Sequence, residues 1–216
     1  MKVYDSFGPN PRALRMVLLE KDVDLPKVTI DLLGAENRQA PYTDKNPGGQ
    51  VPALELDDGR VLGETVAIFE YLEEKYPNPP LIGRTPEERA ETRMWQRRVE
   101  LKITENLYNG FRFAEGVDLF RPRMRVLPEA AEGLKAVVRD NLAWLDELLA
   151  GRSFVVPDRF TIADVILYCA LDFGRGVGQP LDPALTSLAA WFARVGARPS
   201  AAASLHPLSA AIGSAG

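Results

Sequence analysis

The sequence predicts an α/β domain with a mixed four-stranded sheet, followed by an all-α domain. Strand-like and helix-like segments alternate over residues 1–76, as they do in α/β domains. Residues 76–86 contain four prolines and a glycine, which exclude a helix or a central strand there. The periodic segments that follow all have helical spacing. We therefore expect domains at residues 1–76 and 87–216, joined by a linker at residues 77–86.

The elements of the first domain follow from local signals. A helix begins near Pro11, because proline suits the first turn of a helix, where no N–H is needed. Asp57-Asp58-Gly59 predicts a tight turn between two antiparallel strands. A helical turn is expected at residues 40–44, and a helix with an apolar stripe starts at Glu64 and Thr65. The predicted strands are residues 2–6, 25–33, 53–56 and 60–62.

The second domain begins at Thr85-Pro86, which supplies an N-cap and an N1 proline for a long helix. Gly110 is expected to break this helix. The tail after Pro199 is expected to be exposed, and residues 212–216 to be disordered. Further helices are predicted at residues 128–149 and 185–195.

One more helix is marked by Thr161 and Asp164, which have the spacing of a capping box. The residues that follow are apolar on almost every side, so this helix is predicted to be buried. Cys169 lies within it and is expected to be an inert part of the core.

The composition narrows the classes of function. A net charge of −4 gives no general surface for nucleic acid or an anionic membrane. One cysteine excludes an internal disulfide framework and fits a reducing compartment, and with one histidine it also excludes a Cys/His zinc site. The first residues have no apolar signal-peptide core, and no apolar run approaches membrane-spanning length. We expect a cytoplasmic protein without a metal, nucleic-acid or membrane partner.

The most informative stretch is residues 46–54, Asn-Pro-Gly-Gly-Gln-Val-Pro-Ala-Leu. Its prolines and glycines require a sharp turn, and Pro52 stands directly before a strand, where it cannot donate to the ladder. We expect a cis peptide bond between Val51 and Pro52, because such a bond fits a proline into a tight turn. Glu64 and Thr65 then open a helix whose first turn presents unpaired N–H groups, a ready site for a carboxylate.

This stretch, Glu64-Thr65 and the helix residues Ala67-Ile68-x-x-Tyr71-Leu72 together resemble the glutathione-binding half of glutathione transferases. The resemblance covers nearly the whole chain, because the family also has the capped helix that begins here at Thr161. It implies a thioredoxin-like first domain, an all-α second domain and a homodimer. It also implies a cytoplasmic detoxification enzyme that conjugates the thiolate of its co-substrate glutathione to a small hydrophobic electrophile.

The resemblance assigns the glutathione contacts residue by residue. Glu64 and Thr65 correspond to the residues that hold the γ-glutamyl end. The backbone of Val51, before Pro52, pairs with the glutathione peptide like an added strand, with Gln50 beside it. These assignments agree with the chemistry of a peptide that carries two carboxylates and an ammonium.

The same resemblance implies a cation that binds the glycine carboxylate of glutathione and a pocket for the electrophile. Arg38 stands where the family often has Lys or Arg for the glycine end of glutathione, and Lys45 is the second candidate. A solvent-exposed loop charge is the competing interpretation for Arg38. Tyr108 and Phe111 lie on a helix that faces the active site in this family, so they are expected to line the electrophile pocket, with core packing as the alternative.

The thiolate-stabilising residue is the least defined part of the site. Gly8 stands where many family members carry a serine, and it has no side chain to contribute. Ser6 lies two residues earlier and Asn10 two residues later, at the start of the predicted helix. Some bacterial members use a Thr and an Asn near this point, so Asn10 is our first catalytic candidate and Ser6 the second. A plain N-cap is the competing interpretation for Asn10.

Two other functions stay open on the same scaffold. One is a glutathione-dependent disulfide reductase or peroxidase, although the first loop has no cysteine for a mixed disulfide with the protein. The other is a non-catalytic glutathione-binding module, which Gly8 leaves open. Turnover of a generic electrophile with glutathione separates an enzyme from a binding module, whereas the fold does not.

Overall fold

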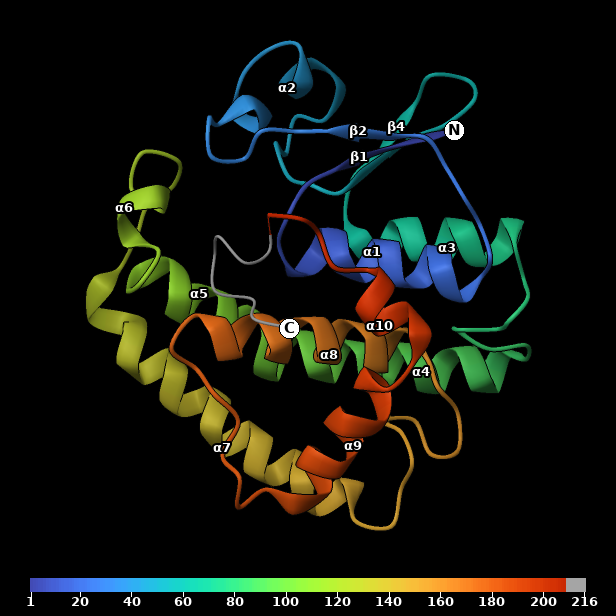
Figure 1. Ribbon diagram of the computed structural model, residues 1–216, viewed down its shortest axis with the longest axis vertical. Coiled ribbons are helices and arrows are strands. Elements are labelled where there is room, and N and C mark those ends of the chain that lie inside the picture. Colours follow the sequence, from blue (N-terminus) through green and yellow to red (C-terminus); the bar gives the residue numbers. More distant parts are fainter. Residues whose placement is uncertain (209–216) are drawn as a thin grey trace.

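The structure, a computed structural model, describes residues 1–208, so the disorder expected at residues 212–216 lies outside the described part. A four-stranded sheet lies at one end of the molecule and a helical bundle at the other (Figure 1). β1 is parallel to β2 and antiparallel to β3, which is antiparallel to β4. This confirms the predicted mixed sheet. The strands, in sheet order, are β2 (Lys27–Thr29), β1 (Lys2–Asp5), β3 (Ala53–Glu55) and β4 (Val61–Leu62).

Helices cover both faces of this sheet, as in a thioredoxin-like domain. Two of them separate the sheet from the bundle, and a short one lies on the opposite side (Figure 1). Because side chains alternate along a strand, Val3 and Leu54 enter the large core, while Tyr4 and Ala53 pack with Tyr42 on the other face. The helices are α1 (Pro9–Glu20), α3 (Thr65–Lys75) and the short α2 (Tyr42–Lys45), which follows the 3₁₀ turn η1 (Glu36–Arg38).

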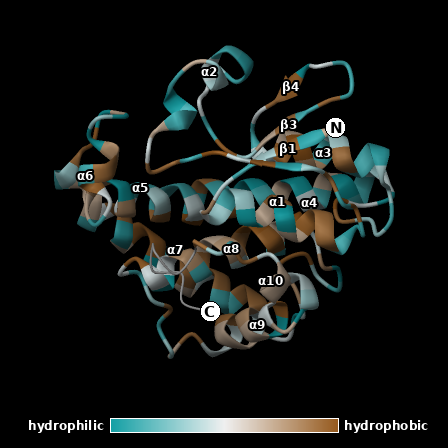
Figure 2. Cartoon of the chain, turned by 45° about the horizontal axis from the view of Figure 1, so that its top comes forward, coloured by the Kyte–Doolittle hydropathy of each residue, from teal (hydrophilic) through white to brown (hydrophobic). Residues whose placement is uncertain are grey.

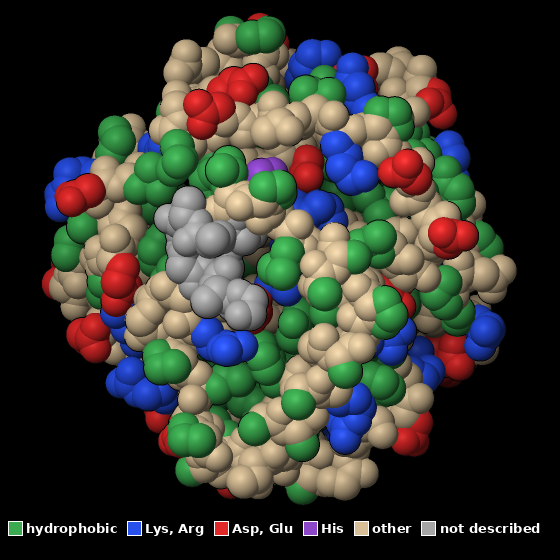
Figure 3. Space-filling model, in the orientation of Figure 1, with side chains coloured by type: hydrophobic (Ala, Val, Ile, Leu, Met, Phe, Trp, Pro, Cys, Tyr) green, Lys and Arg blue, Asp and Glu red, His purple; other side chains and the backbone are tan. Residues whose placement is uncertain are grey.

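The second half is all-α, as predicted. Hydrophobic stretches lie on the strands and on the helix faces that meet inside, and hydrophilic stretches lie outside (Figure 2). Basic and acidic side chains are interspersed over the face drawn in Figure 3. Within residues 1–208, no helix is long and apolar enough to cross a membrane. The elements are α4 (Pro86–Val99), η2 (Glu100–Thr104), α5 (Glu105–Phe113), α6 (Val117–Phe120), η3 (Pro128–Ala130), α7 (Ala131–Leu149), α8 (Ile162–Gly176), α9 (Thr186–Gly196) and α10 (Pro199–Ala203).

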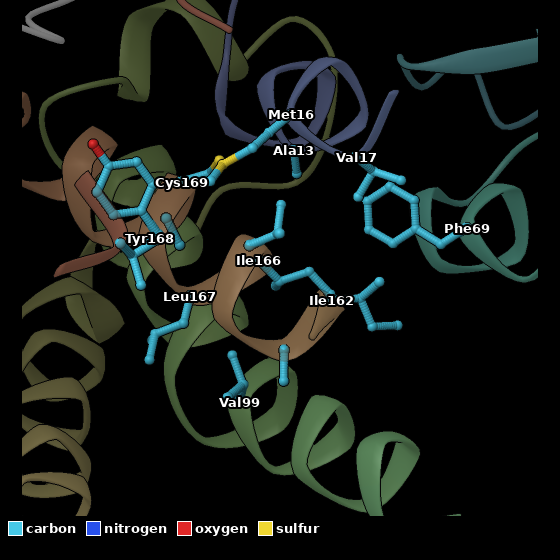
Figure 4. Close-up of a cluster of buried hydrophobic side chains, with 14 of the residues drawn as sticks. Ala13, Met16, Val17, Phe69, Val99, Ile162, Ile166, Leu167, Tyr168 and Cys169 are labelled. Atoms are coloured by element: carbon cyan, nitrogen blue, oxygen red, sulfur yellow. The ribbon is translucent and has the colours of Figure 1, made fainter. Parts of the chain in front are cut away.

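The predicted buried helix is α8, and it joins the two halves. Its capping box is present, since the Thr161 hydroxyl accepts from the Ala163 N–H and an Asp164 oxygen accepts from the Thr161 N–H. Side chains of α1 point toward α8 across the core, and Cys169 lies among them (Figure 4). Burial raises the pKa of Cys169 to about 12, so this thiol stays protonated and unreactive.

The predicted break at Gly110 is wrong, because α5 runs through it. A β-carbon at Gly110 would come within 3.0 Å of a Lys135 side-chain carbon, so the glycine lets α5 approach α7 closely. The irregularity instead lies earlier, in the π-helical turn η2. There the Asn106 side chain donates to the carbonyls of Leu101 and Lys102, each at 3.0 Å, and so satisfies groups that the wider turn releases.

The second strand is shorter than the predicted residues 25–33, because the chain turns immediately after it. The Asp31 carboxylate accepts a hydrogen bond from the Gly34 N–H at 2.9 Å, which is the side-chain turn that Asp commonly forms. β2 is also an edge strand with exposed side chains, so little packing holds a longer one in place.

The expectation of an exposed tail after Pro199 is wrong for Ser200, Ala201 and Ser204, although Ala202 and Ala203 are exposed. Ala201 and Ser204 are buried against α1. Arg12 Nη2 donates to the Ala201 carbonyl at 3.1 Å, and Arg15 Nε donates to the Ser204 carbonyl at 2.8 Å. Two guanidinium groups of α1 thereby donate hydrogen bonds to carbonyls at the end of α10. No local sequence pattern predicts this arrangement.

Candidate active site

A cavity opens between the sheet domain and the helical domain, and the start of α1 forms one of its walls. Gly8 turns the chain from β1 into α1 with a φ of 111°, a conformation that residues with a side chain rarely adopt. The nearest atom to a β-carbon built there would be 3.9 Å away, so conformation and not space requires the glycine. The position that carries a serine in many family members is therefore a backbone turn in this chain.

Asn10 lies in the first turn of α1 and lines the cavity. The Tyr108 hydroxyl donates to Asn10 Oδ1 at 3.4 Å. The Asn10 amide nitrogen forms no hydrogen bond with any residue from 1 to 208, and the N-cap position is held by Gly8. Asn10 is thus not an N-cap, and it retains two N–H donors for a ligand.

Ser6, the second catalytic candidate, is placed differently. Its side chain is buried, and its hydroxyl donates to the Ile30 carbonyl at 2.7 Å, which ties β1 to the segment after β2. Ser6 does not line the cavity, so the structure brings Asn10 and not Ser6 to its wall.

The loop before β3 presents a free peptide edge at Val51. The Val51–Pro52 bond is cis, as predicted. The preceding carbonyl, that of Gln50, accepts from the Tyr42 hydroxyl at 2.6 Å and from Asn46 Nδ2 at 2.8 Å. The N–H and C=O of Val51 have no partner within the described chain, and Val51 and Gln50 both line the cavity. Tyr42 is a supporting residue that the sequence analysis missed, because its partner lies beyond its own helix.

Glu64 and Thr65 stand at the start of α3, outside the lining of the cavity. Glu64 is exposed and has a φ of 59°. The N–H groups of the first three residues of α3 are without acceptors in the described structure, which is what a carboxylate site needs. A β-carbon at Gly63 would lie 3.2 Å from Asn46 Oδ1, so the start of α3 adjoins the loop that carries Val51.

The two candidate cations are in different surroundings. Arg38 lines the cavity, and its Nη1 donates to the Gly48 carbonyl at 3.4 Å. Lys45 instead forms an ion pair with Glu55 at 3.2 Å and does not line the cavity. Arg38 is therefore better placed than Lys45 to meet a ligand in this cavity.

The helical domain supplies an aromatic wall. Tyr108 and Phe111 both line the cavity, where Phe111 packs edge-on against Phe173 with ring centroids 5.1 Å apart. Burial raises the pKa of Tyr108 well above its ordinary value, so its hydroxyl stays a donor. Five further lining residues of this domain could not be predicted from the sequence, because their meeting depends on how the helices pack: Arg112, Leu119, Phe120, Arg123 and Phe173.

A metal site is not apparent: residues 1–208 contain no cluster of His, Cys, Asp and Glu side chains that could hold an ion. The candidate site is instead a cavity with an amide donor, a free peptide edge and a nearby helix start on one side and aromatic rings on the other. Such an arrangement suits a peptide ligand next to an apolar molecule.

Comparisons with known proteins identify the family of the chain. Residues 4–80 match the family model of the glutathione S-transferase N-terminal domain, and residues 128–194 match that of the C-terminal domain. Glutathione S-transferase 2 of Saccharomyces cerevisiae is 31% identical, over 93% of this chain and 87% of that protein. Maleylacetoacetate isomerase of Pseudomonas aeruginosa is 32% identical, over 84% of this chain and 85% of that protein.

A similar structure extends the match to the whole fold. The crystal structure of a glutathione S-transferase domain-containing protein of Marinobacter aquaeolei is 37% identical and superposes with a TM-score of 0.88, covering 93% of this chain and 100% of that one. Both domains and their arrangement are thus shared with a structure of that family. The chain belongs to the glutathione S-transferase family.

Proposed function

We propose that this protein is a glutathione transferase that conjugates the thiolate of glutathione to a small hydrophobic electrophile. The observation that carries the proposal is the cavity between the domains, which is lined both by Asn10, whose amide nitrogen is unpaired among the described residues, and by the aromatic residues Tyr108 and Phe111. A thiol held from the sheet side would there meet an apolar substrate held from the helical side.

Glutathione would lie along the sheet domain. Its γ-glutamyl carboxylate would accept from the first-turn N–H groups of α3 and from the Thr65 hydroxyl, with Glu64 as the anion for its ammonium. Its central peptide would pair with the free N–H and C=O of Val51. The glycine carboxylate would reach Arg38.

The reaction needs a thiolate and no protein base. The thiol proton leaves to solvent, and the Asn10 amide donates to the remaining sulfur anion, helped by the start of α1. The sulfur then attacks an electrophilic carbon: a C–S bond forms, and the leaving group departs with the electron pair of the broken bond. Cys169 takes no part, because it is buried and its pKa is raised to about 12.

Turnover of a chlorodinitrobenzene with glutathione tests this proposal. Product formation above the uncatalysed rate, lowered in a Thr65→Ala variant together with its affinity for glutathione, would support a transferase. Glutathione binding by calorimetry without turnover of chloro-, epoxide or enone electrophiles would instead favour a binding module. Turnover confined to disulfides or peroxides would favour the reductase or peroxidase. We also propose a cytoplasmic location, because the single cysteine fits a reducing compartment.

A further inference from the structure

Three arginines line the cavity, and each has only neutral hydrogen-bond partners. Arg38 donates to the Gly48 carbonyl, Arg112 to the Asn109 side chain at 3.0 Å, and Arg123 to the Leu33 carbonyl at 3.2 Å. Among the described residues, none of the three forms an ion pair with an Asp or Glu. Other arginines of the chain, such as Arg93 and Arg198, do form ion pairs with carboxylates.

These unpaired cations stand in an apolar setting. The Arg112 guanidinium lies 5.8 Å from the Tyr108 ring centroid and 5.6 Å from that of Phe120. The Nε atoms of Arg38 and Arg123 are buried and have no hydrogen-bond partner. Burial lowers the pKa of Arg112 and of Arg123, and the nearby charge of Arg38 adds to this, although Glu105 acts to raise the pKa of Arg112 and Asp31 that of Arg123. Because a guanidinium nevertheless stays charged, the cavity holds positive charge that no direct ion pair within residues 1–208 neutralises.

In the proposed complex, glutathione neutralises only one of these three arginine charges, that of Arg38. Its glycine carboxylate is assigned to Arg38 of the sheet domain, and its γ-glutamyl carboxylate to the start of α3. Arg112 follows Phe111 on α5 and Arg123 follows α6, so both belong to the helical domain, beside the aromatic wall. They therefore face the second substrate.

We infer that the electrophile is an aromatic or apolar molecule that carries an anionic group, such as a carboxylate, which Arg112 and Arg123 bind while the rings of Phe111 and Phe120 hold its body. This inference rests on the proposed function, because it names the substrate class of the same cavity. Two guanidinium groups suit a carboxylate, since each offers parallel N–H donors. Arg123 also spans the two domains through Leu33, so it sits where a substrate would bridge them.

A binding measurement tests the inference without relying on turnover. Dinitrobenzoate and dinitrobenzamide have nearly the same shape but differ in charge, and neither has a halide leaving group. Calorimetry in the presence of S-methylglutathione, which cannot react and occupies the peptide site, should show about ten-fold tighter binding of the benzoate. Arg112→Gln and Arg123→Gln should each remove most of this preference and leave amide binding within about two-fold. Arg112→Lys and Arg123→Lys should keep part of it.

Arg121→Gln is the matched control, because Arg121 is exposed, belongs to the same segment and does not line the cavity. This variant should bind both probes as the wild type does. Equal binding of the two probes, or a benzoate preference that survives both glutamine substitutions, would overturn the inference. So would a loss of S-methylglutathione affinity in the variants without a change in the preference, because the arginines would then serve the glutathione site.

Turnover of a chlorodinitrobenzoate and its amide separates this inference from the proposed function. In that reaction the sulfur of glutathione replaces chloride, which leaves with the electron pair of the C–Cl bond, and the thiol proton goes to solvent. Equal turnover of both compounds would retain the transferase and reject the anion site. A benzoate-specific binding site without turnover of either compound would retain the anion site and reject the transferase.

Discussion

The Tyr108 hydroxyl donates to Asn10 Oδ1 at 3.4 Å and so connects α5 of the helical domain to the first turn of α1. This contact uses the acceptor of the Asn10 amide and leaves its two N–H donors for the cavity. Tyr108, which lines the electrophile side of the cavity, thus orients Asn10, the residue that we propose stabilises the thiolate.

The first prediction concerns that thiolate. A free thiol has a pKa near ~8.5, and lowering it to ~6.5 needs about 2.7 kcal/mol of preferential stabilisation of the anion. One hydrogen bond to a charged group contributes roughly 1.5–3 kcal/mol. Asn10→Ala should therefore raise the pKa of the bound thiol by about one to two units and lower turnover near neutral pH about ten-fold. Thiolate absorbance of the glutathione complex, titrated with pH, measures the shift.

Two variants serve as controls for that result. Tyr108→Phe should raise the thiol pKa less than Asn10→Ala does, because the amide remains and only its orientation is released. Ser6→Ala should leave the pKa unchanged and lower the free energy of unfolding by about 1 kcal/mol, through loss of its bond to the Ile30 carbonyl. An unchanged pKa in Asn10→Ala together with a raised pKa in Ser6→Ala would reverse the assignment.

The second prediction concerns the start of α3. Thr65→Ala removes a hydroxyl donor to the γ-glutamyl carboxylate, so the affinity for glutathione should fall about ten-fold or more. Thr65→Ser keeps the hydroxyl and should bind nearly as the wild type does. Calorimetric titration with glutathione measures both, and wild-type affinity in the alanine variant would show that the site is assigned wrongly.

The third prediction concerns stability and pH. Burial raises the pKa of Asp164 from 3.8 to about 6, although the N–H groups of Val155, Thr161 and Trp191 donate to it. Because the folded state binds this proton more tightly than the unfolded state, the contribution of Asp164 is most favourable below about pH 4 and is lost as the pH rises through about 6.

Denaturant unfolding of the wild type and of Asp164→Asn from about pH 4 to about pH 6 isolates the contribution of Asp164, because all other groups titrate in both proteins. The free energy of unfolding of the wild type, relative to the variant, should fall by up to about 1.4 kcal/mol per pH unit in this window. A difference that is constant with pH would contradict it.

The fourth prediction is a homodimer formed along α4 and η2. The family resemblance implies the dimer, and the sequence over residues 87–108 places Arg89, Arg93, Arg97 and Arg98 beside apolar positions. In the structure, however, Arg93 pairs with Glu70 of the same chain at 2.7 Å. The apolar side chains are free, since Met94 is 42% and Leu101 58% exposed. Sedimentation should show a dimer at micromolar concentration, and Leu101→Glu should give a folded monomer, because it places a charge in an apolar contact. A monomeric wild type at that concentration would reject the interface.

Local signals predicted much of the fold. The Thr161 capping box, the turn at Asp57-Asp58-Gly59 and the motif of residues 46–54 each depend on neighbours in the chain, and all three appear in the structure. In contrast, burial of the tail depends on Arg12 and Arg15, which are far away in the sequence. Single-sequence periodicity contains no information about such partners.

Part of the candidate site could likewise be predicted from local sequence, and part of it could not. The motif placed Val51 and the start of α3, because backbone geometry there is set by nearby prolines and glycines. It could not show that Arg112 and Arg123 would meet at one cavity, since that depends on the packing of α5 and α6 against the sheet domain. Nor could it separate Asn10 from Ser6, which lie four residues apart but face different surroundings.

A crystal structure of the protein with glutathione tests the central claim most directly. We predict the glutathione sulfur within about 3.5 Å of Asn10 Nδ2, with the central peptide paired to the backbone of Val51 and the γ-glutamyl carboxylate at the first turn of α3. Glutathione bound elsewhere, or bound with its sulfur turned away from Asn10 and from the rings of Tyr108 and Phe111, would contradict the proposed site and the mechanism built on it.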